Sequence, residues 1–145
     1  MQNSVVDKKV LIVDRSTKVI LLLALVAAMF AVIFGAFGAH ALKAILSEKM
    51  MAAYQTGVKY QFYHALAMLS VVLLQIRLPG RSVYLFLAGV CFFCGILLFS
   101  GSLYLLALSG ASWLGPFTPL GGVCFILGWL LFIIAIVKEV KVVPW

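Results

Sequence analysis

The sequence predicts an all-α, single-domain integral membrane protein, a four-helix bundle with both termini in the cytoplasm. Hydrophobic residues make up 66% of the 145 residues and charged residues only 10%, whereas soluble domains are about 45–50% apolar and about 25% charged. The mean hydropathy is +1.21. The apolar residues fall into four runs, each long enough to cross a bilayer core of about 30 Å. A chain of this composition has too little polar surface for a water-facing fold.

The distribution of basic residues predicts the orientation in the membrane. The net charge of +7 would suggest nucleic acid as the partner of a soluble protein, but here the Lys and Arg residues flank apolar runs, which is typical of membrane proteins. Eight of them lie in the N-terminal lead, the second turn and the C-terminal tail, and three lie on the opposite side. We therefore expect the lipid bilayer, and not nucleic acid, as the partner.

The first segments are a basic cytoplasmic lead over residues 1–18 and a membrane helix over residues 19–39, with Ser16 or Thr17 as the candidate N-cap. A cleaved signal peptide is the alternative, because Ala39-His40-Ala41 fits a small-x-small cleavage site. The apolar run is longer than the roughly 7–15 residues of a signal-peptide core. We therefore interpret it as a retained helix.

The remaining segments complete a transmembrane domain over residues 19–137. Residues 41–57 are expected to form a short amphipathic connector that lies in the membrane interface. Membrane helices are predicted over residues 58–76, 82–108 and 117–137, joined by a basic turn and by an uncharged turn that carries Trp113. Residues 138–145 form a basic cytoplasmic tail.

Small residues predict where the helices pack closely, because van der Waals contact between backbones drives helix association in lipid. Residues 27, 31, 35 and 39 are small and form a ridge on the first helix. GVCF followed by a glycine occurs at residues 89–95 and again at 122–128, which would be an inverted repeat in antiparallel helices. The predicted packing residues are Ala27, Ala31, Gly35, Gly38, Ala39, Gly95, Gly101, Gly121, Gly122 and Gly128.

Polar residues of all four helices fall at a similar depth near the non-cytoplasmic interface. The candidate ligand-binding residues are His40, Tyr60, Gln61, His64, Ser100, Ser102, Tyr104 and Thr118. In one interpretation they are interhelical hydrogen bonds that hold the bundle together. In the other they line a small ligand pocket around His40 and His64.

Metal, haem and catalytic sites are not favoured by this set of residues. His40 and His64 could ligate a metal or haem, but no acidic or thiol ligand accompanies them. Cys91 and Cys94 have the spacing of a redox or zinc motif, yet they lie in an apolar helix, where Cys usually behaves as a small hydrophobe. The apolar runs contain no Asp or Glu for a hydrolytic triad. We therefore expect no cofactor, no metal and no catalytic residue.

Four motifs resemble the small four-helix inner-membrane proteins of the YgdD/YwdK type. They are GAFGAHALK at residues 35–43, TGVKYQFYHALA at 56–67, FSGSLY at 99–104 and TPLGG at 118–122. The resemblance covers residues 19–137, and the N-terminal lead is extended beyond the family pattern. It implies four helices in the inner membrane of a bacterium and a family of unknown function, so no catalytic residue can be transferred.

These observations favour a non-enzymatic membrane component that acts by binding or assembly, with a homo-oligomer or a membrane-protein partner as the possible assembly. The alternative is an oligomeric carrier or binder of a small solute or lipid-like ligand, which would use the polar cluster. An enzyme or cofactor protein comes third.

Overall fold

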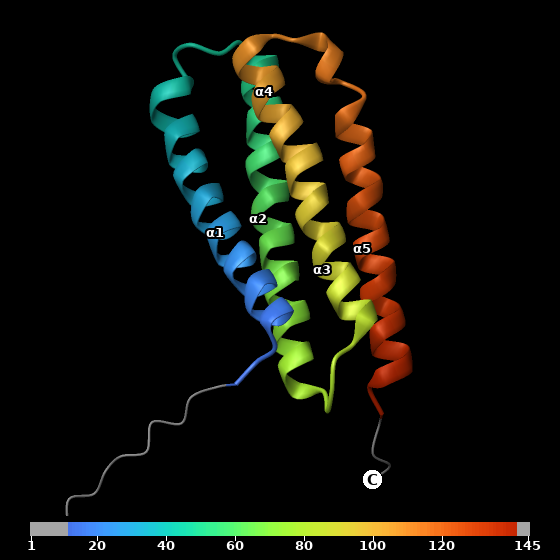
Figure 1. Cartoon of the computed structure of the whole chain (residues 1–145). Coiled ribbons are helices and arrows are strands. Elements are labelled where there is room, and N and C mark those ends of the chain that lie inside the picture. Colours follow the sequence, from blue (N-terminus) through green and yellow to red (C-terminus); the bar gives the residue numbers. More distant parts are fainter. Residues whose placement is uncertain (1–11, 142–145) are drawn as a thin grey trace, which may run out of the picture.

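The computed structural model describes residues 12–141 and forms four long helical spans that lie side by side and run alternately up and down (Figure 1). The spans are Arg15–Leu42, Glu48–Arg77, Val83–Ser109 and Ser112–Glu139, each long and apolar enough to cross a membrane. There is no strand in the described part of the chain. This confirms the predicted all-α, four-helix membrane architecture. The start of the first span and the end of the last lie at one end of the bundle (Figure 1).

The spans divide into shorter elements because two of them contain a π-helical segment. The elements are α1 (Arg15–Phe37), a π-helical segment (Gly38–Leu42), α2 (Glu48–Arg77), α3 (Val83–Gly95), a second π-helical segment (Ile96–Ser100), α4 (Gly101–Ser109), a short 3-10 turn (Ser112–Leu114) and α5 (Phe117–Glu139). π-Helical turns are rare and occur frequently at functional sites. Neither segment was predicted from the sequence.

The N-cap of the first helix is Asp14, which precedes the expected Ser16 by two residues and the expected Thr17 by three. Its carboxylate accepts hydrogen bonds from the backbone N–H groups of Ser16 (3.0 Å) and Thr17 (3.2 Å) and from both hydroxyls. Hydrogen bonds from the Ser16 hydroxyl and from Thr17 hold the pKa of Asp14 below its usual range. Ser16 and Thr17 therefore act as donors to the cap and lie inside the helix.

The connector between the first two spans is shorter than the expected stretch of residues 41–57. Ser47 caps α2 by accepting from the backbone N–H of Met50 (3.4 Å), so the helix begins at Glu48. The residues expected in the interface thus form the first turns of α2. Tyr54 is buried there and donates from its hydroxyl to the carbonyl of Phe34 in α1 (2.9 Å). Leu42 and Tyr54 form a small buried cluster with Leu46, Met50 and Met51 packed against it, whereas Ile45 is 75% exposed.

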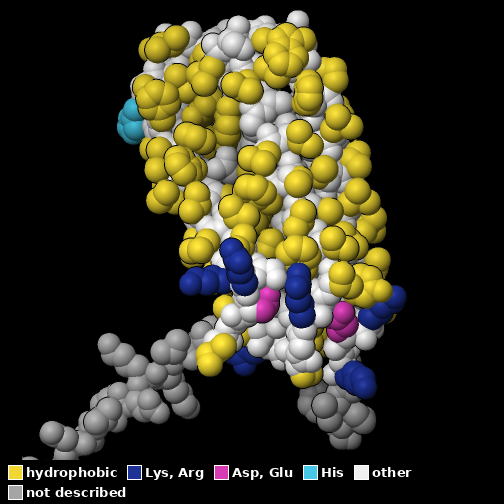
Figure 2. Space-filling model, viewed as in Figure 1, with side chains coloured by type: hydrophobic (Ala, Val, Ile, Leu, Met, Phe, Trp, Pro, Cys, Tyr) yellow, Lys and Arg dark blue, Asp and Glu magenta, His cyan; other side chains and the backbone are white. Residues whose placement is uncertain are grey.

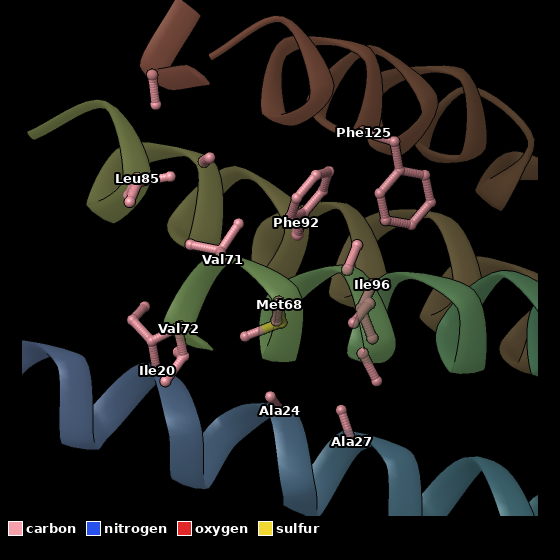
Figure 3. Packing of buried hydrophobic residues seen from close by; sticks show 14 residues of the cluster. Ile20, Ala24, Ala27, Met68, Val71, Val72, Leu85, Phe92, Ile96 and Phe125 are labelled. Carbon is pink, nitrogen blue, oxygen red and sulfur yellow. The ribbon is translucent and has the colours of Figure 1, made fainter. Parts of the chain in front are cut away.

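The core lies between all four spans. Figure 3 shows Ala24 and Ala27 of α1 facing Met68 of α2, and Phe92 of α3 beside Phe125 of α5. The alanines let α1 approach α2 closely, while the rings fill the wider space between α2, α3 and α5. Hydrophobic burial drives little of this association inside a bilayer, so the fit of these side chains supplies the contact energy.

Two glycine–phenylalanine contacts between α3 and α5 are reciprocal. A Cβ at Gly95 would lie 2.4 Å from the ring of Phe125, and a Cβ at Gly128 would lie 2.6 Å from the ring of Phe92. These are equivalent positions in the repeat seen in the sequence. The repeat therefore has a physical basis, because each helix offers a glycine to the ring of the other.

The other predicted packing residues behave differently from one another. Ala27, Ala31, Gly38 and Gly121 are buried in close contacts, with a Cβ at Gly121 only 2.3 Å from the backbone nitrogen of Phe99. Gly35 has ordinary contact space beside Val58. Three predictions differ from the structure: Ala39 is exposed, and a Cβ at Gly101 or Gly122 would meet nothing within 4 Å. The π-helical segment Gly38–Leu42 alters the helical period there, so the four-residue ridge does not continue to Ala39.

Candidate functional site

The predicted polar cluster divides into two groups that begin at neighbouring positions on α2 and contact different helices. Gln61 and His64 are three residues apart and both are buried, with 5% and 6% of their surfaces exposed. Gln61 faces α1 and α4, whereas His64 faces α3 and α5. We call the first group the Gln61 link and the second the His64 box.

The Gln61 link joins three helices through one side-chain amide. Its Nε2 donates to the backbone carbonyl of Ala27 in α1 (2.8 Å), and its Oε1 accepts from the Tyr104 hydroxyl in α4 (2.9 Å). The small side chain of Ala27 allows the amide to reach that carbonyl. Both polar side chains keep unused hydrogen-bonding positions: the Gln61 amide has a second hydrogen and a second oxygen lone pair, and the phenolic oxygen of Tyr104 can also accept.

The Tyr104 ring is held in place by close neighbours. It lies edge-on to Phe34 with a centroid separation of 5.2 Å, and 5.1 Å from the ring of Tyr54. A Cβ at Gly57 would be 2.9 Å from the same ring. Gly57 therefore makes room on α2 for Tyr104, a contact that was not predicted.

The His64 box consists of His64, Phe92, Phe125 and Trp129. The imidazole stacks on Phe125 with a centroid separation of 3.5 Å and an interplanar angle of 8°. Its Nδ1 lies 2.8 Å from the carbonyl oxygen of Tyr60, and the indole Nε1 of Trp129 lies 3.4 Å from its Nε2. A carbonyl only accepts and an indole N–H only donates, so the proton is on Nδ1. Both imidazole nitrogens are thus engaged, and neither is left free for a metal.

Three of the remaining predicted residues, Ser100, Ser102 and Thr118, do not join either group. Ser102 in α4 donates to the carbonyl of Phe99 (2.9 Å), so the 2.7 Å contact between Ser102 and Thr118 has Thr118 as the donor. This pair ties α4 to the first turn of α5. Ser100 is fully buried, with 0% exposed, and its hydroxyl has no hydrogen-bond partner among the described residues.

Two predicted residues lie on the outside of the bundle. His40 is exposed in the π-helical segment Gly38–Leu42 and does not contribute to the surroundings of His64. Tyr60 is 40% exposed and stacks on Phe99 with centroids 4.6 Å apart. The structure therefore does not bring the two histidines together. Within residues 12–141, no three His, Cys, Asp or Glu side chains lie close enough to hold a metal ion.

A lateral groove of about 380 Å³ lies beside the Gln61 link, between α1 and the third span. Its lining is apolar except for Gln61 and Tyr104. The lining residues are Leu23, Val26, Ala27, Phe30, Phe34, Gln61, Phe93, Ile96, Leu97, Gly101 and Tyr104. Ligand sites are typically clefts of about 300–1,000 Å³ with aromatic walls and a few polar groups. The groove has this size and this chemistry.

The comparisons with known proteins agree on one family. The model of the family described as "Protein of unknown function (DUF423)" matches residues 34–122. The UPF0382 membrane protein YwdK of Bacillus subtilis is 45% identical over 121 residues, which cover 83% of this chain and 98% of that protein. A UPF0382 membrane protein of Staphylococcus epidermidis is 46% identical over 121 residues, or 83% of this chain and 97% of the relative.

A more distant relative is the UPF0382 inner membrane protein YgdD of Escherichia coli. It is 37% identical over 124 residues, which cover 85% of this chain and 92% of that protein. No solved structure matches the chain. The resemblance inferred from the four motifs is thereby confirmed.

Proposed function

The chain belongs to the DUF423 family of membrane proteins of unknown function, and we propose that it is a non-enzymatic protein that binds a lipid-like ligand in the lateral groove. The observation that carries this proposal is the placement of Gln61 and Tyr104 in an otherwise apolar lining. An apolar groove alone would select nothing from the surrounding lipid. Two polar groups at a fixed position can select a molecule by its own polar group.

The hydrogen-bonding positions left in the Gln61 link define the chemistry of the ligand. The second hydrogen of the Gln61 amide suits a carbonyl oxygen, and the free lone pair of the Tyr104 hydroxyl suits a hydroxyl donor. Both groups are uncharged, so a charged ligand would lose its hydration without compensation. We therefore infer an elongated apolar molecule with one carbonyl or hydroxyl group.

Binding without chemistry is supported by the absence of acid–base groups near the groove. All four carboxylate side chains of the sequence, Asp7, Asp14, Glu48 and Glu139, lie outside the apolar runs. The polar groups of the groove are an amide and a phenol that already bond to each other. No activated nucleophile with a base is formed by this pair.

The groove can be tested by filling it from its rim. Leu97 lines the groove and is 58% exposed, so Leu97→Trp should block it without disturbing the core. Leu127 on α5 is 47% exposed and does not line the groove, which makes Leu127→Trp the matched control. The probe is a long-chain alcohol with a diazirine at the end of its chain, photoactivated in the purified protein. Labelled residues are then identified by mass spectrometry.

We expect labelling on α1 and α3 near the groove in the wild type and in Leu127→Trp, and several-fold less in Leu97→Trp. Equal labelling of all three proteins would show that the probe samples the whole apolar surface and would contradict the proposal. Labelling confined to residues at an interface between two copies of the chain would instead indicate that the protein acts by self-assembly.

We also propose that the chain resides in the inner membrane of a bacterium, as the name of its relative YgdD says of that protein, with both termini in the cytoplasm. The basic residues at one end of the bundle support the orientation. Cysteines introduced at positions 12 and 141 should both be protected from an impermeant thiol reagent in intact cells. Labelling of either from outside would reverse the orientation.

A further inference from the structure

Exposed cations gather at the end of the bundle that holds the start of α1 and the end of α5. Figure 2 shows dark-blue Lys and Arg side chains there, below a broad yellow apolar surface. The described cations at this end are Arg15, Lys18, Arg77, Arg81, Lys138 and Lys141, and the carboxylates among them are Asp14 and Glu139. The excess of positive charge makes this end attractive to anions.

Among these cations, Arg81 is carried by a turn that is fixed on both sides. The amide of Gln75 donates to the carbonyl of Gly80 (2.8 Å) and accepts from the backbone N–H of Ser82 (3.0 Å). One buried side chain thus holds both neighbours of Arg81. Ser82 in turn caps α3 by accepting from the N–H of Leu85 (3.1 Å).

The guanidinium group is also held, and its donors remain available. Its central carbon lies 4.8 Å from the centroid of the Phe86 ring, a cation–π contact that orients the group without using its N–H donors. Arg81 makes no side-chain hydrogen bond within residues 12–141, whereas Lys138 donates to the Tyr84 hydroxyl (2.9 Å). Arg81 is therefore an oriented donor with no acceptor in the described part of the chain.

Two shallow clefts share Arg81 as a wall. One, of about 330 Å³, lies between the start of α1 and the turn after α2, and Asp14 and Gln75 also line it. The other, of about 350 Å³, lies on the side of Pro79 and Glu139. The Asp14 carboxylate accepts the hydrogen bonds that cap α1.

We propose that Arg81 and the first of these clefts bind the phosphate of an anionic membrane lipid. A planar guanidinium matches a phosphate with two parallel hydrogen bonds. The site lies where the apolar surface ends, which is the level of lipid headgroups, and basic clefts at that level attract anionic lipids. The site is remote from the lateral groove and does not depend on the function proposed for it.

The experiment measures how lipid raises the thermal stability of the detergent-purified protein, since a ligand that binds only the folded state raises Tm. Phosphatidylglycerol is compared with phosphatidylcholine of the same acyl chains, and inorganic phosphate is added alone in a third arm. The variants are Arg81→Gln, Phe86→Leu, Lys141→Gln at the same end and Lys43→Gln at the opposite end. Each titration yields an apparent affinity and a Tm without lipid.

We expect phosphatidylglycerol to bind more tightly than phosphatidylcholine and Arg81→Gln to weaken it by about fivefold. Lys141→Gln should weaken it by less than about twofold, and Lys43→Gln should have no effect. Phe86→Leu keeps the charge but frees the guanidinium, so an intermediate loss is expected even if Arg81→Gln does not fold.

Three results would overturn the proposal. The first is an equal rise in Tm with phosphatidylglycerol and with phosphatidylcholine. The second is an equal loss of lipid affinity in Arg81→Gln and Lys141→Gln, which would indicate a diffuse charge effect. The third is a full stabilisation by inorganic phosphate alone, which would show that the lipid is not the ligand.

Discussion

The Gln61 link and the His64 box begin three residues apart on α2, yet they are held by different forces. The Gln61 link depends on directed hydrogen bonds to α1 and α4, whereas the His64 box depends on ring contacts with α3 and α5. Residues at this spacing are neighbours on one helix. The comparison shows that two neighbours can serve different helix pairs, because the packing on each side of α2 decides what each side chain meets.

The most severe way to break the His64 box is Phe125→Ala. This change removes the ring stacked on His64 and leaves a cavity next to Phe92 and Gly95, so we expect a loss of about 3–5 kcal/mol in the free energy of unfolding. The measurement is reversible unfolding in mixed micelles. Phe62→Ala is the control, because Phe62 lies on the surface of α2 and is 36% exposed. A loss no larger than that of the control would show that the box carries little stability.

Gln61→Leu should break the Gln61 link with a smaller loss in the free energy of unfolding than Phe125→Ala causes. The change leaves the Tyr104 hydroxyl half-buried without its acceptor, and we expect a loss of about 1–3 kcal/mol. Gln55→Leu is the matched control, because Gln55 lies exposed on the same helix. In a double-mutant cycle with Tyr104→Phe, the two losses should not be additive. Strict additivity would mean that the 2.9 Å contact contributes nothing.

The comparison is sharpened by two substitutions of His64. His64→Phe keeps the stacked shape and loses only polar contacts, so we expect a loss near the average of about 0.6 kcal/mol for hydrogen bonds in membrane proteins. His64→Asn keeps polar atoms but loses the ring. If the box is held by ring contacts, Asn should be the more destabilising of the two in the same unfolding assay. The opposite order would assign the stability of the box to the hydrogen bonds of His64.

The smallest effect on stability is expected at the start of α1. This segment is charged and exposed, so it can be compared with the two buried regions. The pKa of Asp14 is lowered in the folded state by its hydrogen bonds to Ser16 and Thr17. Its contribution to stability is therefore complete above the unfolded-state pKa of about 4 and is lost as the pH falls through the folded-state value. The protection factors of the amides in the first turn of α1, which are corrected for the pH dependence of intrinsic hydrogen exchange, should fall on acidification in wild type and should change less with pH in Asp14→Asn. An identical pH response in both proteins would contradict the role of the carboxylate.

The fold was predictable because four long apolar runs have one physical solution in a bilayer. The start of α2 was not, because an amphipathic stretch looks the same whether its apolar face meets lipid headgroups or protein. In the structure, the Tyr54 hydroxyl donates a hydrogen bond to the Phe34 carbonyl and packs the start of α2 against α1. No spacing along the chain indicates this contact.

The site was predictable in part. Gln61 and Tyr104 were singled out as polar residues in an apolar span, and the structure brings them together. The acceptor on Ala27 is a backbone carbonyl, which every residue has, so the sequence carries no signal for it. Phe125 and Trp129 were missed because aromatic residues in a lipid-facing run are common. His40 was included because it falls at the same depth as the other polar residues, but it is exposed and lies in a π-helical segment that was not predicted.

The reciprocal contacts between α3 and α5 place a constraint on how this helix pair can change during evolution. Gly95 makes room for Phe125, and Gly128 makes room for Phe92. A larger residue at either glycine becomes tolerable only when the facing ring shrinks, so substitutions should arise as matched changes within each contact. Because two equivalent contacts support the same interface, one can drift while the other preserves the alignment of the helices. Duplication of a simple motif would thus give the interface a tolerance to mutation that a single contact lacks.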